Sequence, residues 1–374
     1  MKRSPTRTAI LLGAALCGAG CVLSSTPTGP AGLASKTVTT LAGQAGTIGS
    51  ADGTGTAATL GFPAGVVVGP GAVLYVCDSF NSTIRAINLG TGAATTIAGV
   101  PGVASWFDNT AALAAFFNHP EGIATDGTNL YVADSGNNAI RKIVLPGGPV
   151  TTIAGNPNVL PGSADGIGSA ALFNNPLGIC FDSANSILYV TDSGNSTLRA
   201  VPTNGTSTST VAGQAEVFGS SDGTGTAATF TYPEGIVIDG GNANLYVTDT
   251  GNGTIRRLVI ASKAVTTLAG QTGVRGDVDG PGAAAQFNWP EGIAIDSTDM
   301  YLYVADTLNN VIRQVVIGSG AVTTLAGQGE TAGSADGAGD VATFNHPMRL
   351  VFSLPSLYVG DTYNETIRRV SPMP

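Results

Sequence analysis

The sequence copies itself six times from residue 37 onward, and this repetition limits the possible folds more than any other feature. The glycine of a Thr-(Ile/Leu/Val)-Ala-Gly element recurs at Gly43, Gly99, Gly155, Gly213, Gly270 and Gly327. The aspartate of a Leu-Tyr-Val-x-Asp element recurs with the same period at Asp78, Asp134, Asp192, Asp249, Asp306 and Asp361. Repeats of this length indicate a propeller, a solenoid or an array of small units.

Each repeat contains four short runs with the composition of β-strands. In the second repeat they are Gly122–Asp126, Leu130–Asp134, Ala139–Val144 and Val150–Ala154. These runs are rich in β-branched and aromatic residues, and turn residues such as those at 135–138 separate them. Four antiparallel strands repeated six times predict an all-β fold, a six-bladed β-propeller of four-stranded blades.

The ends of the repetitive region favour a closed ring. Val38–Ala42 precedes the first complete repeat, and the last repeat, Met348–Val370, has only three of its four strands. The N-terminal run is therefore predicted to complete the last blade as its outer strand, which leaves few unpaired sheet edges. A linear solenoid would need polar capping repeats, and none is evident.

The repeated motifs resemble those of the NHL-repeat family. Pro-Glu-Gly-Ile-Ala, Leu-Tyr-Val-Ala-Asp, Ser-Gly-Asn-Asn-x-Ile-Arg and Val-Thr-Thr-Leu-Ala-Gly carry the resemblance, which covers residues 37–372. The resemblance implies a six-bladed propeller but no single activity. The family includes RNA-binding modules, sensor domains of receptor kinases, an amidating lyase and many exported proteins, so function must be argued from the site.

The first 20 residues have the pattern of an export signal. A basic start is followed by an apolar run from Ala9 to Leu16 and by small residues directly before Cys21. This arrangement resembles a bacterial lipoprotein signal, which implies that the lipid is attached to Cys21, although Gly18 stands where that family usually has leucine. Ordinary secretion and an uncleaved anchor are the alternatives. Residues 21–36 are predicted to form a flexible tether to a propeller at 37–374.

Composition narrows the classes of partner. The chain has 16 Lys and Arg residues against 25 Asp and Glu residues, for a net charge of −9. Removal of residues 1–20 would take away three positive charges, and 13 against 25 gives −12. A negatively charged surface disfavours nucleic acid. No apolar run of about 18 residues is present, so the membrane is reached only through a lipid anchor. Cys77 and Cys180 are expected to be small buried residues.

Recurring charged residues are interpreted as structural. We expect the aspartate that ends the second strand to form a turn and to pair with the arginine of the third strand. These arginines are Arg85, Arg141, Arg199, Arg256, Arg313 and Arg368. An Asp-Gly-x-Gly element in the connections is expected to form a turn or a helix cap, with a calcium loop as the weaker alternative. Its aspartates are Asp52, Asp165, Asp222, Asp279 and Asp336.

Residues that depart from the repeat mark the candidate ligand site. A proline opens the first strand of each repeat, which is expected to line the central channel, so its neighbours should face one mouth. The residue before it is Phe62, His119, Asn175, Tyr232, Trp289 or His346. The residue after it is Ala64, Glu121, Leu177, Glu234, Glu291 or Met348. The next position is glycine in five repeats and Arg349 in the sixth.

This predicts a rim of aromatic and imidazole groups above three carboxylates. The candidate ligand-binding residues are His119, Glu121, Tyr232, Glu234, Trp289, Glu291, His346 and Arg349. Such a site could bind a sugar, a peptide, or a cation such as calcium through the glutamates. The alternative is that these positions are merely exposed and vary freely, with Arg349 neutralising the glutamates.

The connection at residues 100–119 is the other departure from the repeat. Its glycine pattern is lost, and Trp106 and Phe107 have no counterpart elsewhere. An exposed aromatic pair would suit a contact with a partner protein. Packing of both rings beneath the loop is the alternative.

No catalytic residue is assigned. The chain lacks a Gly-x-Ser-x-Gly motif, and its two histidines, His119 and His346, are too few for the zinc site of the amidating lyase. The sequence therefore favours an exported, non-catalytic binding module, monomeric, at the cell envelope or secreted, with a protein or carbohydrate partner. A calcium-dependent lactonase-like hydrolase and a rigid structural surface protein are the alternatives.

Overall fold

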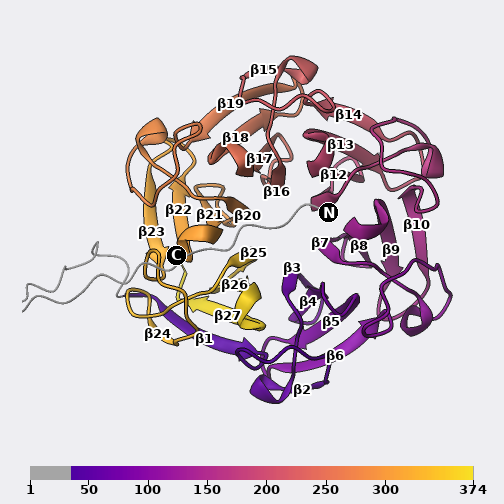
Figure 1. The fold of residues 1–374 in the computed structure, drawn as a ribbon, viewed down its shortest axis with the longest axis horizontal. Helices are drawn as coiled ribbons and strands as arrows, with labels where there is room; N and C mark the ends of the chain where they lie inside the picture. The colour runs from indigo at the N-terminus through magenta and orange to yellow at the C-terminus, as the bar shows by residue number, and fades with distance from the viewer. Residues whose placement is uncertain (1–34, 374) are drawn as a thin grey trace, which may run out of the picture.

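Each repeat folds into one antiparallel sheet, and the six sheets stand around a central axis as the blades of a propeller (Figure 1). The computed structural model describes residues 35–373. The expected signal at 1–20, Cys21 and nearly all of the tether at 21–36 lie outside the described residues. The predicted six-bladed, all-β fold is confirmed.

The strands of each blade run in sequence order from the central axis outward. Blade 1 consists of β3 (Pro63–Gly69), β4 (Val73–Asp78), β5 (Thr83–Asn88) and β6 (Ala93–Ala98). Blade 2 consists of β7 (Pro120–Thr125), β8 (Asn129–Asp134), β9 (Ala139–Val144) and β10 (Val150–Gly155). Blade 3 consists of β11 (Pro176–Asp182), β12 (Ile187–Asp192), β13 (Thr197–Pro202) and β14 (Ser209–Ala212).

The second half of the ring repeats this order. Blade 4 consists of β16 (Pro233–Ile238), β17 (Asn244–Asp249), β18 (Thr254–Val259) and β19 (Ala264–Ala269). Blade 5 consists of β20 (Pro290–Ile295), β21 (Tyr301–Asp306), β22 (Val311–Val316) and β23 (Val322–Ala326). Blade 6 consists of β25 (Pro347–Ser353), β26 (Ser356–Asp361), β27 (Thr366–Ser371) and β1 (Thr37–Ala42).

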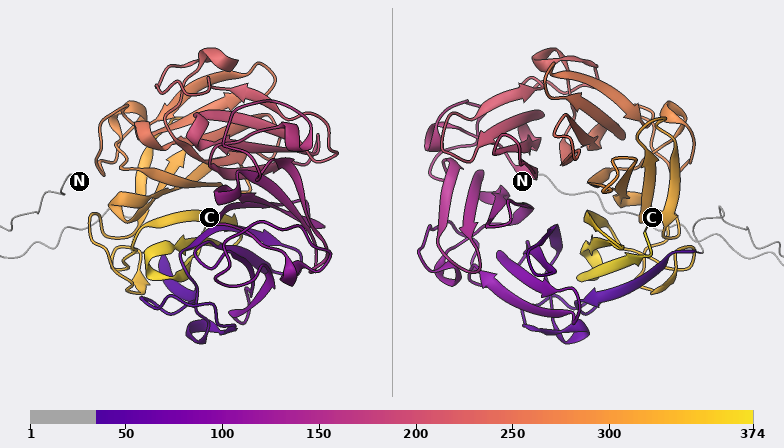
Figure 2. Two further views of the ribbon diagram at one scale, coloured as in Figure 1. Left: turned by 45° about the vertical axis from the view of Figure 1, so that its right-hand side comes forward. Right: turned by 180° about the vertical axis from the view of Figure 1, so that it is seen from behind.

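The ring closes through β1, as the sequence predicts. β1 lies antiparallel to β27, with Val38 opposite Val370 and Thr39 opposite Arg369 (Figure 1). Val38 is fully buried, and the Lys36 ammonium donates a hydrogen bond to the Pro372 carbonyl at 2.9 Å. The two ends of the described chain therefore stabilise one blade together, and the back view shows the same closure (Figure 2).

Three blades carry a short fifth strand that the sequence did not predict. These edge strands are β2 (Gly53–Thr54), β15 (Gly223–Thr224) and β24 (Gly337–Ala338). They pair with the outer strands β6, β19 and β1. Each belongs to the connection between blades, which folds back over the outer edge of the sheet and satisfies part of its backbone.

Single turns of 3-10 helix complete the fold. In the connections they are η2 (Gly55–Ala57), η3 (Ala112–Ala114), η5 (Gly168–Ala170), η7 (Gly225–Ala227) and η9 (Gly282–Ala284). Between the second and third strands they are η4 (Ser135–Asn137), η6 (Ser193–Asn195), η8 (Thr250–Asn252), η10 (Thr307–Asn309) and η11 (Thr362–Asn364).

The hydrophobic core lies between blades. Cys77 and Ile84 of blade 1, for example, pack in one cluster with Leu130 and Ile143 of blade 2. Because each sheet buries side chains on both faces, neighbouring blades share one core, and the ring is stabilised by contacts between successive repeats. Cys77 and Cys180 are free and buried, which confirms the expectation of small buried residues.

In each blade one arginine forms ion pairs with two aspartates. In blade 4, Arg256 donates to Asp249 at 2.6 Å and to Asp222 at 2.8 Å, and it also donates to the carbonyls of Ser221 and Thr229. All six arginine side chains are at most 1% exposed, and the inner aspartate is fully buried in each blade. The predicted pairing of aspartate with arginine is confirmed, and it is structural.

Of the two roles predicted for the aspartates of the connections, a turn or a helix cap, the helix cap is wrong. Asp222 instead accepts hydrogen bonds from Arg256 and from the backbone and hydroxyl of Thr267. The 3-10 turns that follow the connection aspartates have no side-chain cap. Blade 2 fills the same position with Asp108, 2.7 Å from Arg141, although the surrounding glycine pattern is absent there.

Candidate ligand-binding channel

The six innermost strands, β3, β7, β11, β16, β20 and β25, line the central channel, and the order of their residues divides it into layers (Figure 1). Glycine occupies the layer two residues after the opening proline because adjacent strands approach closely there. A Cβ at Gly178 would lie 2.1 Å from the carbonyl oxygen of Glu234, and one at Gly122 would lie 2.0 Å from that of Leu177. A Cβ at either glycine would therefore collide with the backbone of the next blade.

Arg349 is the one side chain in this layer. It is 7% exposed, and its Nη1 atom donates to the Glu291 carbonyl oxygen at 2.8 Å. Its Nη2 atom lies 3.6 Å from the Glu234 carboxylate. The guanidinium lines the cavities on both of its sides, so it divides the channel into a polar chamber and an apolar chamber.

The polar chamber has a volume of about 410 Å³ and lies at the mouth where the innermost strands begin. It is lined by His119, Glu121, Ser135, Gly136, Asn175, Leu177, Glu234, Glu291, Met348 and Arg349. The structure thus brings together the three glutamates, the arginine and one histidine of the predicted site. Ser79, which the sequence did not single out, donates to Glu121 at 2.7 Å.

Burial changes the acidity of all three glutamates. Loss of solvent raises the pKa of Glu234 to about 7, and the nearby Arg349 only partly offsets this effect. Burial, reinforced by repulsion from Glu234, raises the pKa of Glu291 well above its ordinary value. Burial also raises the pKa of Glu121, against the stabilising hydrogen bond from Ser79. Burial therefore favours the protonated form of all three carboxyl groups.

Several buried polar atoms in this layer have no hydrogen-bond partner within the described residues. They are Oε2 of Glu121, Oε2 of Glu291, and Nε and Nη2 of Arg349. Buried polar atoms in folded proteins are normally paired, and each exception requires an explanation. Here acceptors and donors lack partners around a single cavity, which suits a ligand or ordered water that offers both.

The predicted aromatic rim forms only in part, because three of its residues do not line the chamber. Tyr232 is 43% exposed and contacts Phe218, with ring centroids 5.2 Å apart. Trp289 is half-buried beneath the Arg275 guanidinium, which lies 5.1 Å from its ring. His346 stacks on Tyr363 at 4.3 Å.

All six rim residues have left-handed backbone conformations. Their φ angles lie between 48° and 59°, which is uncommon for residues other than glycine. The preceding blade holds this backbone in place: the amide of Asn175 donates to Asn138 at 2.7 Å, and that of His346 donates to Asn310 at 2.9 Å. The ring thus fixes bulky side chains at strained positions around the mouth.

An aromatic cluster that the sequence did not single out lies beside this rim. Phe80 and Tyr363 come from the turns between the second and third strands, and each is 50% exposed. Phe62 lies between them, with ring centroids 5.6 Å from Phe80 and 5.4 Å from Tyr363. Blades 2, 3 and 4 have glycine at this turn position, so only a comparison of the repeats at that position could have found the pair.

Trp106 and Phe107 differ in their surroundings. Trp106 is half-buried and donates a long hydrogen bond of 3.4 Å to Asn158. Phe107 is 51% exposed and contacts Phe116, with centroids 6.1 Å apart. They therefore form no continuous exposed pair, and Phe107 alone presents its ring to solvent.

The described residues offer no ready metal site. Between residues 35 and 373, no group of three or more His, Cys, Asp or Glu side chains is placed to hold a metal ion. The three glutamates stand one residue before the layer of Arg349 and form no such group, so the calcium alternative finds no ligand set among the described residues. Within the same residues, no helix has the length and apolar character needed to cross a bilayer.

Fold and channel together define a six-bladed β-propeller with a polar layer across its axis. A family model described as NHL repeat matches residues 117–143, which span β7 to β9. Residues 117–143 contain the motif elements that recur in every blade. The chain belongs to the NHL-repeat propellers.

Known proteins agree with this assignment. NHL repeat-containing protein 2 of Homo sapiens is 30% identical over 285 residues, which cover 67% of this chain and 39% of that protein. Protein SUPPRESSOR OF QUENCHING 1 of Arabidopsis thaliana is 29% identical over 267 residues, which cover 68% of this chain and 25% of that protein. The chain thus spans well under half of each of these relatives.

A solved structure shares the fold at low sequence identity. It is described as an auxiliary nutrient binding protein from Bacteroides thetaiotaomicron and matches with a TM-score of 0.69 at 18% identity, covering 90% of this chain and 76% of that one. This likeness concerns the fold alone.

Proposed function

We propose that this chain is an exported binding module that takes a small carbohydrate in the polar chamber at the mouth of its channel. The observation that carries the proposal is the gathering of Glu121, Glu234, Glu291 and Arg349 around one cavity of about 410 Å³. A sugar hydroxyl both donates and accepts, so a single sugar ring can satisfy carboxylate oxygens and guanidinium hydrogens at once.

The composition of the chamber supports a neutral polyhydroxylated ligand. Burial raises the pKa of Glu234 to about 7 and raises that of Glu291 well above its ordinary value, so a strongly cationic ligand would compete with protons. An anion in the polar chamber would meet the ionised fraction of these carboxyl groups, which line this chamber and not the apolar chamber on the other side of Arg349.

The proposed location rests on the N-terminal sequence pattern alone. A lipid at Cys21, or secretion after cleavage of residues 1–20, would place the propeller outside the cytoplasm, on a tether formed by residues 21–36. A nutrient-binding role is attributed to the structural neighbour described above, and its fold extends over 90% of this chain. These points support an exported binding protein at the cell envelope, with no catalytic residue.

Calorimetric titration of the full chain with a panel of mono- and disaccharides tests the proposal. A variant with Glu121, Glu234 and Glu291 changed to Gln should lose saturable binding or bind at least tenfold more weakly. The matched control changes the exposed Glu216 and Glu330 to Gln and should bind normally. A panel without saturable binding, or equal binding by the triple variant, would overturn the carbohydrate site.

The same titration with calcium tests the hydrolase alternative. Calcium binding that disappears in the triple Gln variant would favour a metal-dependent enzyme. Absence of both calcium and sugar binding would leave a contact with a partner protein, or a structural role.

The aromatic cluster supports a protein partner as the second candidate. Phe80 and Tyr363 expose half of their surface beside Phe62 and His346 at the same mouth, and exposed aromatic residues of this kind are typical of interfaces. Changing Phe80 and Tyr363 to glycine, the residue of three other blades, should abolish such a contact. Sugar binding and the melting temperature should stay unchanged.

A further inference from the structure

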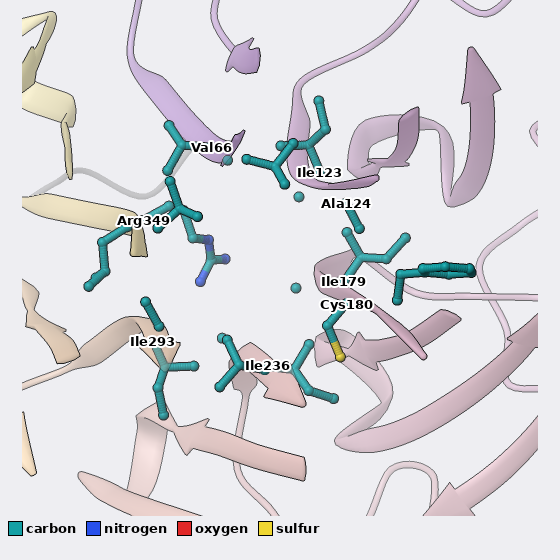
Figure 3. A pocket seen from close by; sticks show the side chains of 18 of the residues that line it. Val66, Ile123, Ala124, Ile179, Cys180, Ile236, Ile293 and Arg349 are labelled. Carbon is teal, nitrogen blue, oxygen red and sulfur yellow. The ribbon is translucent and has the colours of Figure 1, made fainter. Parts of the chain in front are cut away.

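The channel beyond Arg349 holds a second chamber of different chemistry. It has a volume of about 350 Å³ and is lined by aliphatic side chains from all six innermost strands (Figure 3). The ring of side chains next to Arg349 consists of Val66, Ile123, Ile179, Ile236, Ile293 and Leu350. This volume lies within the range of about 300–1,000 Å³ that is typical of small-molecule sites.

The residues of this ring belong to the cores between the blades and also border the cavity. Each keeps between 5% and 7% of its surface exposed, whereas many core residues between the blades, such as Leu130 and Leu245, are fully buried. The labelled side chains of Ile123, Ile179, Ile236 and Ile293 surround the axis without filling it (Figure 3). An apolar cavity of this kind attracts water poorly and gains free energy when hydrocarbon enters it.

The chamber is elongated along the axis. A second layer, which includes Phe181, Ile238, Ile295 and Phe352, follows two residues further along the strands. Because a strand rises about 3.3 Å per residue, the three residues from Arg349 to Phe352 span roughly 10 Å. A straight hydrocarbon chain of about eight carbons has a similar length.

A single charged group closes the inner end of the chamber. Arg349 is more than nine-tenths buried, and its guanidinium reaches into the channel (Figure 3). Its Nε and Nη2 atoms have no hydrogen-bond partner among the described residues, and its closest carboxylate, Glu234, remains 3.6 Å away. A guanidinium presents paired donors that match a carboxylate, and the pairing strengthens away from water.

We propose that the apolar chamber binds a straight-chain carboxylate head first, with the carboxylate on Arg349 and the hydrocarbon chain along the aliphatic ring. This site lies on the other side of Arg349 from the polar chamber and does not depend on carbohydrate binding. The ligand carboxylate replaces the distant Glu234 as the partner of Arg349, and the tail covers the residual apolar surface of the ring.

Calorimetric titration of the full chain with octanoate, octan-1-ol and octylamine tests this proposal. The three probes share a tail and differ in the head. Octanoate should bind saturably with one site per chain, octanol at least tenfold more weakly, and octylamine not measurably. Equal binding of all three, or no saturable binding of octanoate, would overturn the proposal.

Two variants test whether the ligand binds in the apolar chamber. Arg349→Gly introduces the residue that the other five blades carry and should reduce octanoate binding to the level of octanol. Ile236→Phe fills the cavity and should abolish binding of both. The exposed Glu330→Gln is the control and should bind like the wild type. Wild-type octanoate affinity in Arg349→Gly, with its fold verified by circular dichroism, would contradict the assignment.

Discussion

Glu234 makes the stability of this propeller depend on pH in a direction that can be calculated. Its pKa is 4.5 in an ordinary environment and about 7 in the folded chain, because burial disfavours the charged form. A raised carboxyl pKa contributes stability that is fully present below pH 4.5 and is lost as the pH rises to about 7. At about 1.4 kcal/mol per pH unit, the loss amounts to about 3 kcal/mol.

Glu234→Gln should remove this contribution. The amide resembles the protonated carboxyl group in shape and stays neutral, so the variant and the wild type should have similar stability at pH 4.5. At pH 8 the variant should be more stable than the wild type by about 3 kcal/mol. The comparison of the two pH values cancels effects of shape that do not depend on pH.

Urea unfolding followed by tryptophan fluorescence at pH 4.5, 6, 7 and 8 measures this difference. The exposed Glu330→Gln serves as the control and should follow the wild type at every pH. If the stability of Glu234→Gln changed with pH in the same way as that of the wild type, ionisation of Glu234 in the folded chain would cost little free energy. The assigned cause, burial of the carboxyl group, would then be wrong.

Three other substitutions test the framework of the ring by equilibrium unfolding. Arg256→Met removes the cationic partner of Asp249 and Asp222 and should cost about 3–5 kcal/mol, whereas Arg257→Met, on the exposed side of the same strand, should cost less than about 1 kcal/mol. Gly178→Ala forces a methyl group against the Glu234 carbonyl and should cost about 1–3 kcal/mol or more, while Gly241→Ala, with free space around it, should be nearly neutral. Val38→Ala removes buried contacts of the closing strand and should cost about 2 kcal/mol. Equal costs for the two arginines or the two glycines, or a neutral Val38→Ala, would contradict the roles given to these residues.

The ring could be predicted from the sequence because six copies of one pattern leave few alternatives. Comparison of the six repeats also identified the pairing of Asp249 with Arg256 as structural. It identified Arg349 as an exception at a position that is otherwise glycine. It failed for Asp108, which keeps its role although the glycines that mark this position elsewhere are missing. It also missed the short fifth strands, because two backbone pairs need no particular side chain.

The site was harder to predict because the role of a residue depends on its depth along the channel, which the sequence does not give. Trp289 and Glu291 stand two positions apart in the sequence, yet Glu291 lines the chamber and Trp289 packs beneath Arg275 outside it. The aliphatic residues from Val66 to Leu350 have the composition of core residues, and only the spacing of six strands around an axis shows that they border a cavity.

The central claim is that the layer formed by Arg349 and the three glutamates exists to bind a ligand and does not hold the ring together. The most direct measurement is the free energy of unfolding of a variant in which these four residues are replaced by their counterparts in other blades. Arg349 is changed to Gly. Glu121, Glu234 and Glu291 are changed to Leu, the residue at position 177. A layer built for binding costs stability, so this variant should be at least as stable as the wild type at pH 7 and more stable at pH 8. A variant less stable by several kcal/mol would show that the polar layer supports the fold, and the account of the channel as a binding site would lose its basis.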